Sequence, residues 1–349
     1  MSSIKCLRGC SEGRDHCLRR TDQLRALILE QFGSPLRLTE IPKPVTGPGQ
    51  VLVRVGASGV NPLDLKIKAG AAGHAKAVLP AILGLDLAGT VEAAGAGVTA
   101  FREGDEVYGL TGGVGGVPGS LAEYAVVDAD LLARKPSRLS MREAAAIPLG
   151  FITAWEGLVD RARIQGGEQV LIHAGAGGVG HMAVQLACAY GADVYATVSP
   201  GKNAIVEGYG ASPIDYRAEA VAAYVDRCTG GRGFDVVYDT VGGATLDASF
   251  VAVKSYTGRV VSCLGWGTHS LAPLSFRAAT YSGVFTLMPL LTGKGRAHHG
   301  EILQEAARLA DAGKLTPLVD ATEFSLESVE AAHQLAESGH ARGKVVISI

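Results

Sequence analysis

Val170-Leu-Ile-His-Ala-Gly175-Ala-Gly177-Gly178-Val-Gly180 is the most informative segment of the chain. It contains the pattern G-x-G-x-x-G between an apolar run and an apolar-periodic segment that predicts a helix. In that setting Gly175 permits a tight turn, Gly177 lets the backbone approach a pyrophosphate, and Gly180 lets the helix pack closely on the strand. The first N–H groups of the helix and its dipole also favour a phosphate. The alternative interpretation is a glycine-rich turn that binds no ligand.

The end of the next strand indicates which dinucleotide fits. A site for NAD has an Asp or Glu there, about 20 residues past the glycines, to bind the ribose 2′-OH. The chain instead reads Ala196-Thr-Val-Ser199-Pro-Gly-Lys202, with Asp193 at the start of the strand and Glu207 a turn into the next helix. A hydroxyl and an ammonium suit a 2′-phosphate, so we expect NADP(H). The alternative for Lys202 is a surface lysine in a first helical turn.

Strands and helices alternate after Pro148, which predicts a parallel, doubly wound α/β sheet of the Rossmann type. Helices are expected at 141–146 and 153–159 before the alternation begins. The expected strands are 169–173, 193–198, 234–239 and 259–263, and the helices between them are 178–190, 202–210, 218–228 and 245–254. Helices near 301–312 and 326–338 and a strand at 344–349 end the chain.

The preceding part of the chain has a different pattern. Short apolar runs separated by Gly and Pro turns fill residues 24–150 and predict a mostly β, barrel-like domain. Residues 1–23 show no periodicity, and we expect a disordered tail. Two alternatives are a zinc site made by Cys6, Cys10, His16 and Cys17, whose spacing matches no usual site, and a mitochondrial targeting segment, which the acidic residues disfavour.

Composition excludes several classes of protein. The chain has 349 residues, with 32 Lys and Arg against 34 Asp and Glu, and this balance gives no electrostatic footprint for a nucleic acid. No run of about 18 apolar residues is free of charge and proline, so we expect no membrane span. The six cysteines form no Cys-x-x-Cys pair, which favours free thiols in a reducing cytoplasmic compartment.

Two further segments could be mistaken for binding sites. The stretch from Thr111 to Ser120 is even richer in glycine, but a strand follows it, so we expect a flexible surface loop without a phosphate. The pair His298 and His299 has no cysteine nearby, and we expect a solvated loop instead of a metal site.

Several motifs together resemble the medium-chain dehydrogenase/reductase superfamily, in its zinc-independent quinone oxidoreductase (zeta-crystallin-like) branch. The matching stretches are Gly59-Val-Asn-Pro-Leu-Asp-Leu-Lys66, Pro80-Ala-Ile-Leu-Gly-Leu-Asp-Leu-Ala-Gly89, Gly104-Asp-Glu-Val-Tyr108, Ala122-Glu-Tyr124, Ala174-Gly-Ala-Gly-Gly-Val-Gly180 and Gly343-Lys-Val-Val346. The resemblance covers residues 24–349. It implies a GroES-like catalytic domain at 24–150, completed by 315–349, and a Rossmann NADP-binding domain at 151–314.

The branch within the superfamily is indicated by absent ligands. Zinc-dependent alcohol dehydrogenases that resemble this chain have a Cys near residue 60 and a Gly-His-Glu near residue 84. Those places read Asn61 and Gly84-Leu-Asp86 here, and residues 90–130 contain no cysteine for a structural zinc lobe. Zinc sites need such nitrogen and sulfur ligands, so we expect no bound metal.

The resemblance also implies site residues. Asn61 and Asp64 are expected beside the nicotinamide as catalytic residues, although Asn61 could only fix the turn before Pro62 and Asp64 could only cap a helix. The residues expected at the cofactor are Thr153, Gly175, Gly177, Gly178, Val179, Gly180, Ser199, Lys202, Tyr216, Val241, Gly242, Leu264, Gly265 and Lys344. Lys202 and Tyr216 match residues that hold the 2′-phosphate.

These features predict an NADPH-dependent oxidoreductase that reduces quinones or α,β-unsaturated carbonyls by hydride transfer. Such acceptors need no Lewis acid, Asn61 could stabilise the developing oxyanion, and the proton could come from solvent. The alternatives are an enoyl-thioester reductase and a non-catalytic NADPH-binding sensor. The expected partner is a small molecule, and the apolar segment 284–287, taken as a strand, predicts an edge-to-edge homodimer.

Overall fold

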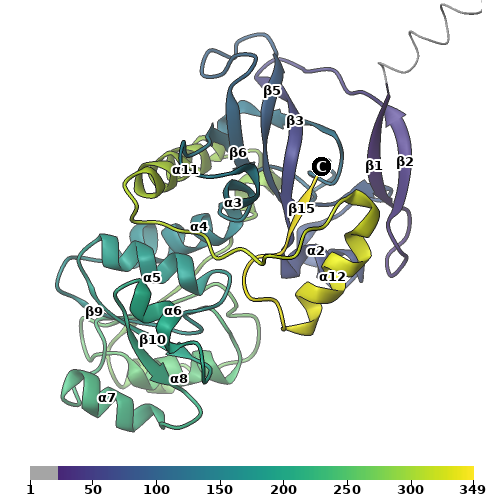
Figure 1. Cartoon of the computed structure of the whole chain (residues 1–349). Helices are drawn as coiled ribbons and strands as arrows, with labels where there is room; N and C mark the ends of the chain where they lie inside the picture. Colours follow the sequence, from purple (N-terminus) through teal and green to yellow (C-terminus); the bar gives the residue numbers. More distant parts are fainter. Residues whose placement is uncertain (1–22) are drawn as a thin grey trace, which may run out of the picture.

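The structure is a computed structural model that describes residues 23–349 and contains two sheet-based regions (Figure 1). The expected tail therefore lies outside the described residues, apart from Gln23, which begins the first strand. No helix within 23–349 has the length and apolar character that a bilayer crossing requires.

The first region is antiparallel, as its short apolar runs predict. Its main sheet has the order β15-β3-β5-β6-β8, with β7 also paired to β3, and a smaller sheet has the order β2-β1-β4. The strands are β1 (Gln23–Leu29), β2 (Arg37–Pro42), β3 (Gln50–Gly59), β4 (Ala81–Ile82), β5 (Asp86–Ala94), β6 (Glu106–Leu110), β7 (Tyr124–Asp128), β8 (Leu132–Arg134) and β15 (Val346–Ser348). Its helices are α2 (Pro62–Lys68), α3 (Met141–Ala145), η1 (Gly73–Ala75) and η2 (Ala129–Leu131).

The second region is the expected parallel sheet, with the order β11-β10-β9-β12-β13-β14. The strands are β9 (Gln169–Ile172), β10 (Asp193–Val198), β11 (Ser212–Asp215), β12 (Val236–Asp239), β13 (Arg259–Ser262) and β14 (Thr280–Gly283). Strand β9 is central, and its Val170, Leu171 and Ile172 have no solvent exposure, because helices cover both faces of a doubly wound sheet. The alternation of strands and helices is thus confirmed, and it brings the carboxyl ends of β9, β10 and β12 to one edge.

Helices cover the parallel sheet and join it to the first region. They are α4 (Pro148–Trp155), the π-helical turn η3 (Glu156–Arg161), α5 (Gly180–Ala189), α6 (Asn203–Gly208), α7 (Val221–Thr229), α8 (Ala244–Ala252), α9 (Ala272–Ser275), α10 (Met288–Thr292), α11 (Arg296–Asp311), η4 (Leu326–Ser328) and α12 (Val329–Ser338). Helix α11 lies against η2 and β8 of the first region. A Cβ on Gly300 would be 2.7 Å from the carbonyl oxygen of Asp130, so only glycine allows this approach.

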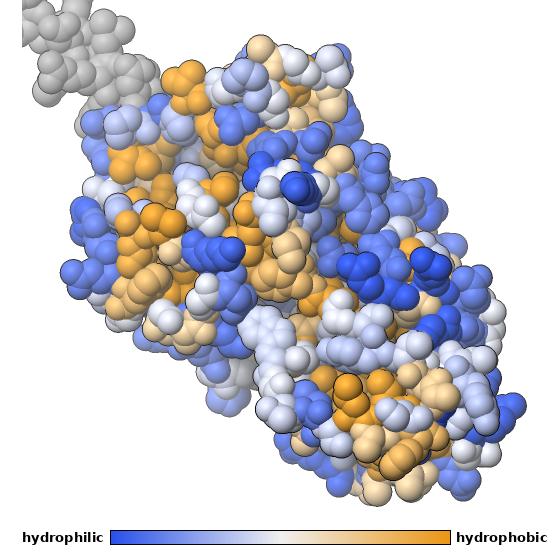
Figure 2. Space-filling view, turned by 180° about the vertical axis from the view of Figure 1, so that it is seen from behind, coloured by the Kyte–Doolittle hydropathy of each residue, from blue (hydrophilic) through white to orange (hydrophobic). Residues whose placement is uncertain are grey.

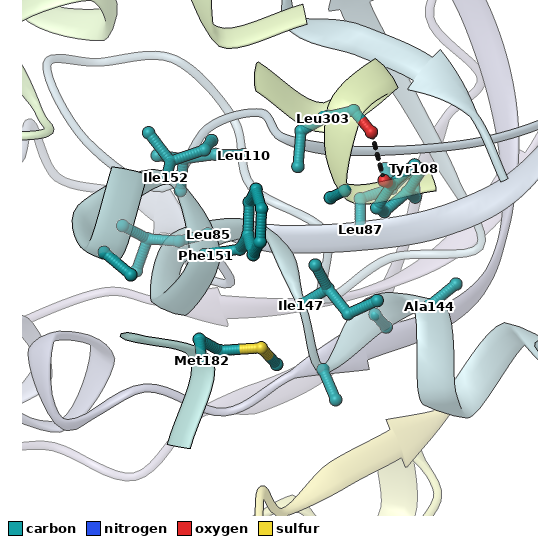
Figure 3. Close-up of a cluster of buried hydrophobic side chains, with 14 of the residues drawn as sticks. Leu85, Leu87, Tyr108, Leu110, Ala144, Ile147, Phe151, Ile152, Met182 and Leu303 are labelled. Atoms are coloured by element: carbon teal, nitrogen blue, oxygen red, sulfur yellow. Dashed lines mark hydrogen bonds between the residues drawn. The ribbon is translucent and has the colours of Figure 1, made fainter. Parts of the chain in front are cut away.

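One continuous apolar core extends across both regions. Phe151 of α4 lies among side chains from the antiparallel sheet, from α5 and from α11 (Figure 3). The hydroxyl of Tyr108 donates a hydrogen bond of 2.5 Å to the carbonyl oxygen of Leu303, which satisfies the polar end of a fully buried ring (Figure 3). Burial also raises the pKa of Tyr108 well above its usual value.

Three expectations about local structure are wrong. The glycine-rich stretch 111–120 is mostly buried, because its amides bond to the backbone of the strand β4 and of residues near it, and only its tip is exposed. Residues 284–287 are not a strand, since β14 ends at Gly283, and Val284 and Leu287 are buried. His298 and His299 belong to α11, and His299 is fully buried with its Nε2 3.2 Å from Glu156 Oε1.

Candidate active site

A cleft of about 320 Å³ has walls from both regions of the chain. Eight of the expected site residues line it: Asn61, Thr153, Gly177, Gly178, Val179, Gly180, Leu264 and Lys344. Other expected residues lie outside its lining: Asp64, Gly175, Ser199, Lys202, Tyr216, Val241, Gly242 and Gly265. Sequence reasoning missed the rest of the wall: Pro62, Leu63, Lys66, His74, Leu149, Gly150, Ala174, Thr240, Cys263, Trp266, Val284, Phe285, Thr286 and Leu287.

The glycine loop forms one wall and has the features of a phosphate cradle. Among the hydrogen bonds of the described chain, the amides of Gly178 and Val179 donate none, and both precede the start of α5. A Cβ on Gly178 would have no atom within 4 Å, so this position faces open space. Ala174, just before the glycines, has a φ of +52°, which is strained for a residue with a side chain. Free amides at a helix start fit a pyrophosphate.

The carboxyl ends of β10 and β11 carry a second polar group. Val198 pairs with Asp215 in register, so the loops that contain Ser199 and Tyr216 lie side by side. A hydrogen bond from Ser199 is the main cause that lowers the pKa of the exposed Tyr216 hydroxyl, followed by Arg217. The Nε of Arg217 donates to this hydroxyl at 3.3 Å.

Lys202 is exposed just before α6, and its amide donates to the carbonyl of Ser199 at 3.1 Å. The structure therefore brings Ser199, Lys202 and Tyr216 together, with Arg217 beside them. The two cations, Lys202 and Arg217, and the two hydroxyls, Ser199 and Tyr216, match a 2′-phosphate. Arg217 was missed, although its place directly after Tyr216 was a usable signal.

A buried carboxylate organises the loops after β12 and β13. Asp239 accepts hydrogen bonds from the amides of Val241 at 3.0 Å and Gly242 at 2.9 Å, and from the Ser262 hydroxyl at 2.7 Å. These bonds fix both loops at the same sheet edge. Leu264 reaches the cleft, whereas Val241 is half exposed outside its lining.

Asn61 lies in a buried polar network at the opposite wall. Its Nδ2 donates to Asp86 Oδ2 at 2.9 Å, and its Oδ1 accepts from the ammonium of Lys344. The same ammonium lies 3.0 Å from Asp86 Oδ2, and the amide of Leu149 donates to Asp86 Oδ1 at 2.8 Å. The network therefore ties the first region to the start of α4.

Asp64 lies behind this network, where its carboxylate caps α2. Its Oδ2 accepts from the Asn61 amide at 2.8 Å and its Oδ1 from the Gly84 amide at 3.2 Å. Burial raises the pKa of Asp64 to about 7, and the charge of Asp86 adds a smaller increase. The hydrogen bonds from the two amides act in the opposite direction and lower this pKa. The arrangement matches the helix-capping alternative.

Aromatic side chains surround the other end of the cleft. The rings of His74 and Trp266 meet edge to face with centroids 4.2 Å apart, and Phe285 lies 6.1 Å from His74. Burial, followed by the charge of Lys66, lowers the pKa of His74, so its ring is neutral at pH 7. Thr153 and Thr286, which also line the cleft, share a hydroxyl hydrogen bond of 3.0 Å. The lining contains no carboxylate.

Metal-type ligands do not gather anywhere in residues 23–349: no three His, Cys, Asp or Glu side chains are close enough to hold an ion together. The alternative zinc site of Cys6, Cys10, His16 and Cys17 lies outside the described residues.

Two family models match the chain. The alcohol dehydrogenase GroES-like domain matches residues 47–137, and the zinc-binding dehydrogenase model matches residues 209–347. The chain is 37% identical over 311 residues to the 2-methylene-furan-3-one reductase of Solanum lycopersicum, covering 85% of this chain and 71% of that protein. It is 34% identical over 336 residues to the chloroplastic NADPH-dependent alkenal/one oxidoreductase of Arabidopsis thaliana, covering 93% and 79%.

A more distant relative and solved structures extend this similarity. The human quinone oxidoreductase is 28% identical over 330 residues, with 93% of this chain and 97% of that protein covered. An alcohol dehydrogenase superfamily protein from Novosphingobium aromaticivorans superposes with a TM-score of 0.92 at 54% identity, covering 93% and 99%. The CurK enoyl reductase superposes with a TM-score of 0.81 at 28% identity, covering 94% and 99%. The chain belongs to the medium-chain dehydrogenase/reductase superfamily, in its quinone oxidoreductase branch.

Proposed function

We propose that the protein is an NADPH-dependent reductase of quinones or α,β-unsaturated carbonyls that works without zinc. One observation carries the proposal: a single cleft joins the free amides of the glycine loop to a largely apolar chamber whose wall includes the Lys344 ammonium. The chain belongs to the medium-chain dehydrogenase/reductase superfamily, and its relatives named alkenal/one oxidoreductase and quinone oxidoreductase support this substrate class.

NADPH is proposed over NADH because of the group at the ends of β10 and β11. The glycine loop would hold the pyrophosphate, and Ser199, Lys202, Tyr216 and Arg217 would hold the 2′-phosphate. No acid stands at the end of β10, where an NAD site would need one. The Arabidopsis relative, described as NADPH-dependent, supports this choice.

The chemistry divides between cofactor and protein. The reduced nicotinamide, when bound, supplies a hydride. Within this chain, Lys344 provides a hydrogen-bond donor at one wall, while the Asn61 amide is occupied by Asp86 and by the Gly59 carbonyl. Leu264, Phe285 and Trp266 provide apolar surface that excludes water. A quinone or enone spreads the incoming charge onto an oxygen, so a donor suffices where a metal would otherwise be needed. Less than one zinc per chain by metal analysis, with activity unchanged by chelators, would support this.

An enoyl-thioester reductase is the second candidate, because the CurK enoyl reductase superposes over nearly the whole chain. A non-catalytic NADPH sensor is the third. The experiment that separates them follows NADPH and NADH consumption with a panel of quinones, enones and a crotonyl thioester. Turnover of quinones and enones supports the proposal, turnover of the thioester alone supports the second candidate, and binding without turnover supports the sensor.

We also propose a homodimer, now through β14 instead of 284–287. Strand β14 is the last strand of the parallel sheet, and Tyr256, Leu271 and Phe276 near it are exposed. Seen from behind, the parallel-sheet region carries an apolar surface patch (Figure 2). Sedimentation of the full chain tests this. A cytoplasmic location is retained as a proposal from the free thiols Cys188, Cys228 and Cys263.

A further inference from the structure

The ammonium of Lys344 is fixed at the cleft wall by two contacts and has a third donor to offer. It donates to Asn61 Oδ1 and lies 3.0 Å from Asp86 Oδ2, while the lysine side chain is only 10% exposed. A lysine ammonium carries three N–H donors, so one remains beyond these two contacts. Because Lys344 lines the cleft, that donor is available to a molecule inside it.

The backbone of Lys344 is also fixed by hydrogen bonds on both sides, which sets the position from which its side chain starts. The amide of Lys344 donates to Leu318 at 2.7 Å, and its carbonyl accepts from Asp320 at 2.9 Å. The next residues pair with the end of β3, where Val346 lies opposite Gly59. A Cβ on Gly59 would be 3.1 Å from Lys344 Cε, so the glycine makes room for the aliphatic chain. The ammonium is therefore preorganised before any substrate binds.

Asp86 compensates the charge of the buried Lys344 ammonium and fixes its orientation. Both oxygens of this fully buried carboxylate accept other bonds, from the Leu149 amide and from Asn61 Nδ2. An unpaired ammonium in such a place would be strongly destabilising, whereas the pair is neutral as a whole. Asn61 bridges both partners, so its amide acts here as a positioning group for the lysine.

We propose that Lys344 is the catalytic acid of the reduction: its ammonium binds the acceptor's carbonyl oxygen and protonates it. This inference rests on the proposed function. Hydride adds to the β carbon of an enone, and the electron pair of the C=C bond moves through the conjugated system onto the oxygen. The oxygen takes a proton from Lys344, which gives an enol that becomes the saturated ketone in water, and the neutral amine regains a proton from solvent. With a quinone, addition of one hydride and one proton, followed by a proton shift in water where the hydride has entered at a ring carbon, gives the hydroquinone.

The first test uses 4-nitrophenolate, whose oxygen anion resembles the charge that develops on the acceptor. Its absorbance reports binding to the NADP⁺-loaded protein, without turnover. We expect Lys344→Met to weaken phenolate binding at least about tenfold. Lys344→Arg keeps a charged donor and should keep most of the binding. The same change at Lys68, which pairs with Glu330 outside the cleft lining, is the control and should have no effect.

The second test separates an acid from a cofactor ligand. With 9,10-phenanthrenequinone and but-3-en-2-one, kcat of Lys344→Met should fall about 100-fold or more, the usual contribution of a general acid, while the directly titrated Kd for NADPH changes less than about threefold. Lys344→Arg should recover only part of kcat, because an arginine does not release its proton. The double variant Lys344→Met/Asp86→Asn removes the unpaired carboxylate and should show the same losses, which excludes the uncompensated charge of Asp86 as their cause.

Two results would overturn the assignment. Unchanged phenolate binding in Lys344→Met would mean that the ammonium does not reach the oxygen, and a rise in the NADPH Kd parallel to the lost activity would make Lys344 a cofactor ligand. A wild type that binds NADPH and phenolate through Lys344 but reduces no quinone or enone would keep the anion contact and refute the proposed function instead.

Discussion

Gly180 packs so closely on Ala174 that a Cβ on Gly180 would lie 2.0 Å from the Ala174 carbonyl oxygen. This contact is what allows α5 to begin directly behind β9. Gly175 has a similar constraint, because its Cβ would be 2.5 Å from the Cβ of Ala196 on β10. Two of the motif glycines are therefore required by the packing of the protein itself, before any cofactor is considered.

The glycines can be separated experimentally into packing and cofactor positions. Gly178→Ala should leave the melting temperature of the protein without cofactor nearly unchanged, since its Cβ meets no atom, and should weaken NADPH binding about tenfold or more by occupying the phosphate cradle. Gly180→Ala is the matched variant and should lower the melting temperature as well. Differential scanning calorimetry and a fluorescence titration of NADPH measure the two effects.

Gly177 is a less clean probe than its place in the motif suggests. A Cβ there would be 3.0 Å from the Ala174 carbonyl oxygen, so Gly177→Val should cost some stability in addition to cofactor binding. Normal NADPH binding by Gly178→Ala and Gly177→Val together would show that the loop is a bare turn.

The cofactor preference should depend on Lys202 and Arg217. Replacing either residue by Gln should weaken NADPH binding about tenfold or more and leave NADH binding unchanged. The reason is that a hydrogen bond to a charged group contributes roughly 1.5–3 kcal/mol. Isothermal titration with both cofactors gives the ratio. The exposed Lys294→Gln, outside the site, is the control. Equal affinity of the wild type for NADPH and NADH would contradict the assignment of this group.

Much of this organisation could be predicted from sequence because it is local. The strand, glycine loop and helix around Gly175 follow one another in the chain. After Pro148, strand-like and helix-like patterns alternate regularly along the sequence. The parallel sheet and four of its six strands were predicted for this reason, whereas β11 and β14 were missed. Arg217 also lay within reach, since it directly follows the predicted Tyr216.

The remaining features depend on contacts between distant segments. Lys344 meets Asn61 across 283 residues, and nothing near either residue indicates that they touch. The stretch 111–120 has the composition of a surface loop, yet its amides bond to distant backbone carbonyls and bury it. His299 is buried because α11 begins earlier than the apolar pattern indicates and packs against the first region. Hydrophobic periodicity contains no information on such pairings.

Stability should fall in acid because of His181. Burial is the main cause that lowers its pKa from 6.5 to about 4. Its Nδ1 bonds to the Gly177 carbonyl at 2.7 Å, and its Nε2 accepts from the Leu318 amide at 3.3 Å, which a doubly protonated ring cannot do. The unfolded chain takes up this proton below about pH 6.5 and the folded chain only near pH 4, so the free energy of unfolding decreases across that window.

Urea unfolding at pH 7.5 and pH 5.0 measures this decrease. His181→Gln should shrink the difference between the two pH values by roughly 1–2 kcal/mol, given about 1.4 kcal/mol per pH unit for one proton. His173 and His333, whose pKa values burial also lowers to about 4, should account for much of the remainder. An unchanged difference in His181→Gln would show that this histidine does not titrate in the window.

The role of Asp64 can be decided by a substitution that keeps its shape. The carboxylate lies outside the cleft lining and accepts the amides of Asn61 and Gly84, so we expect a capping role and no direct part in the reaction. Asp64→Asn replaces one acceptor with a donor that faces an amide, which should lower the free energy of unfolding by about 1–3 kcal/mol. Because Asn61 is the N-cap of α2, a modest shift of its side chain should raise KM, while kcat stays within about threefold. A loss of kcat comparable to that of a general acid, about 100-fold, in a variant that still folds and binds NADPH would instead make Asp64 part of the proton path to Lys344.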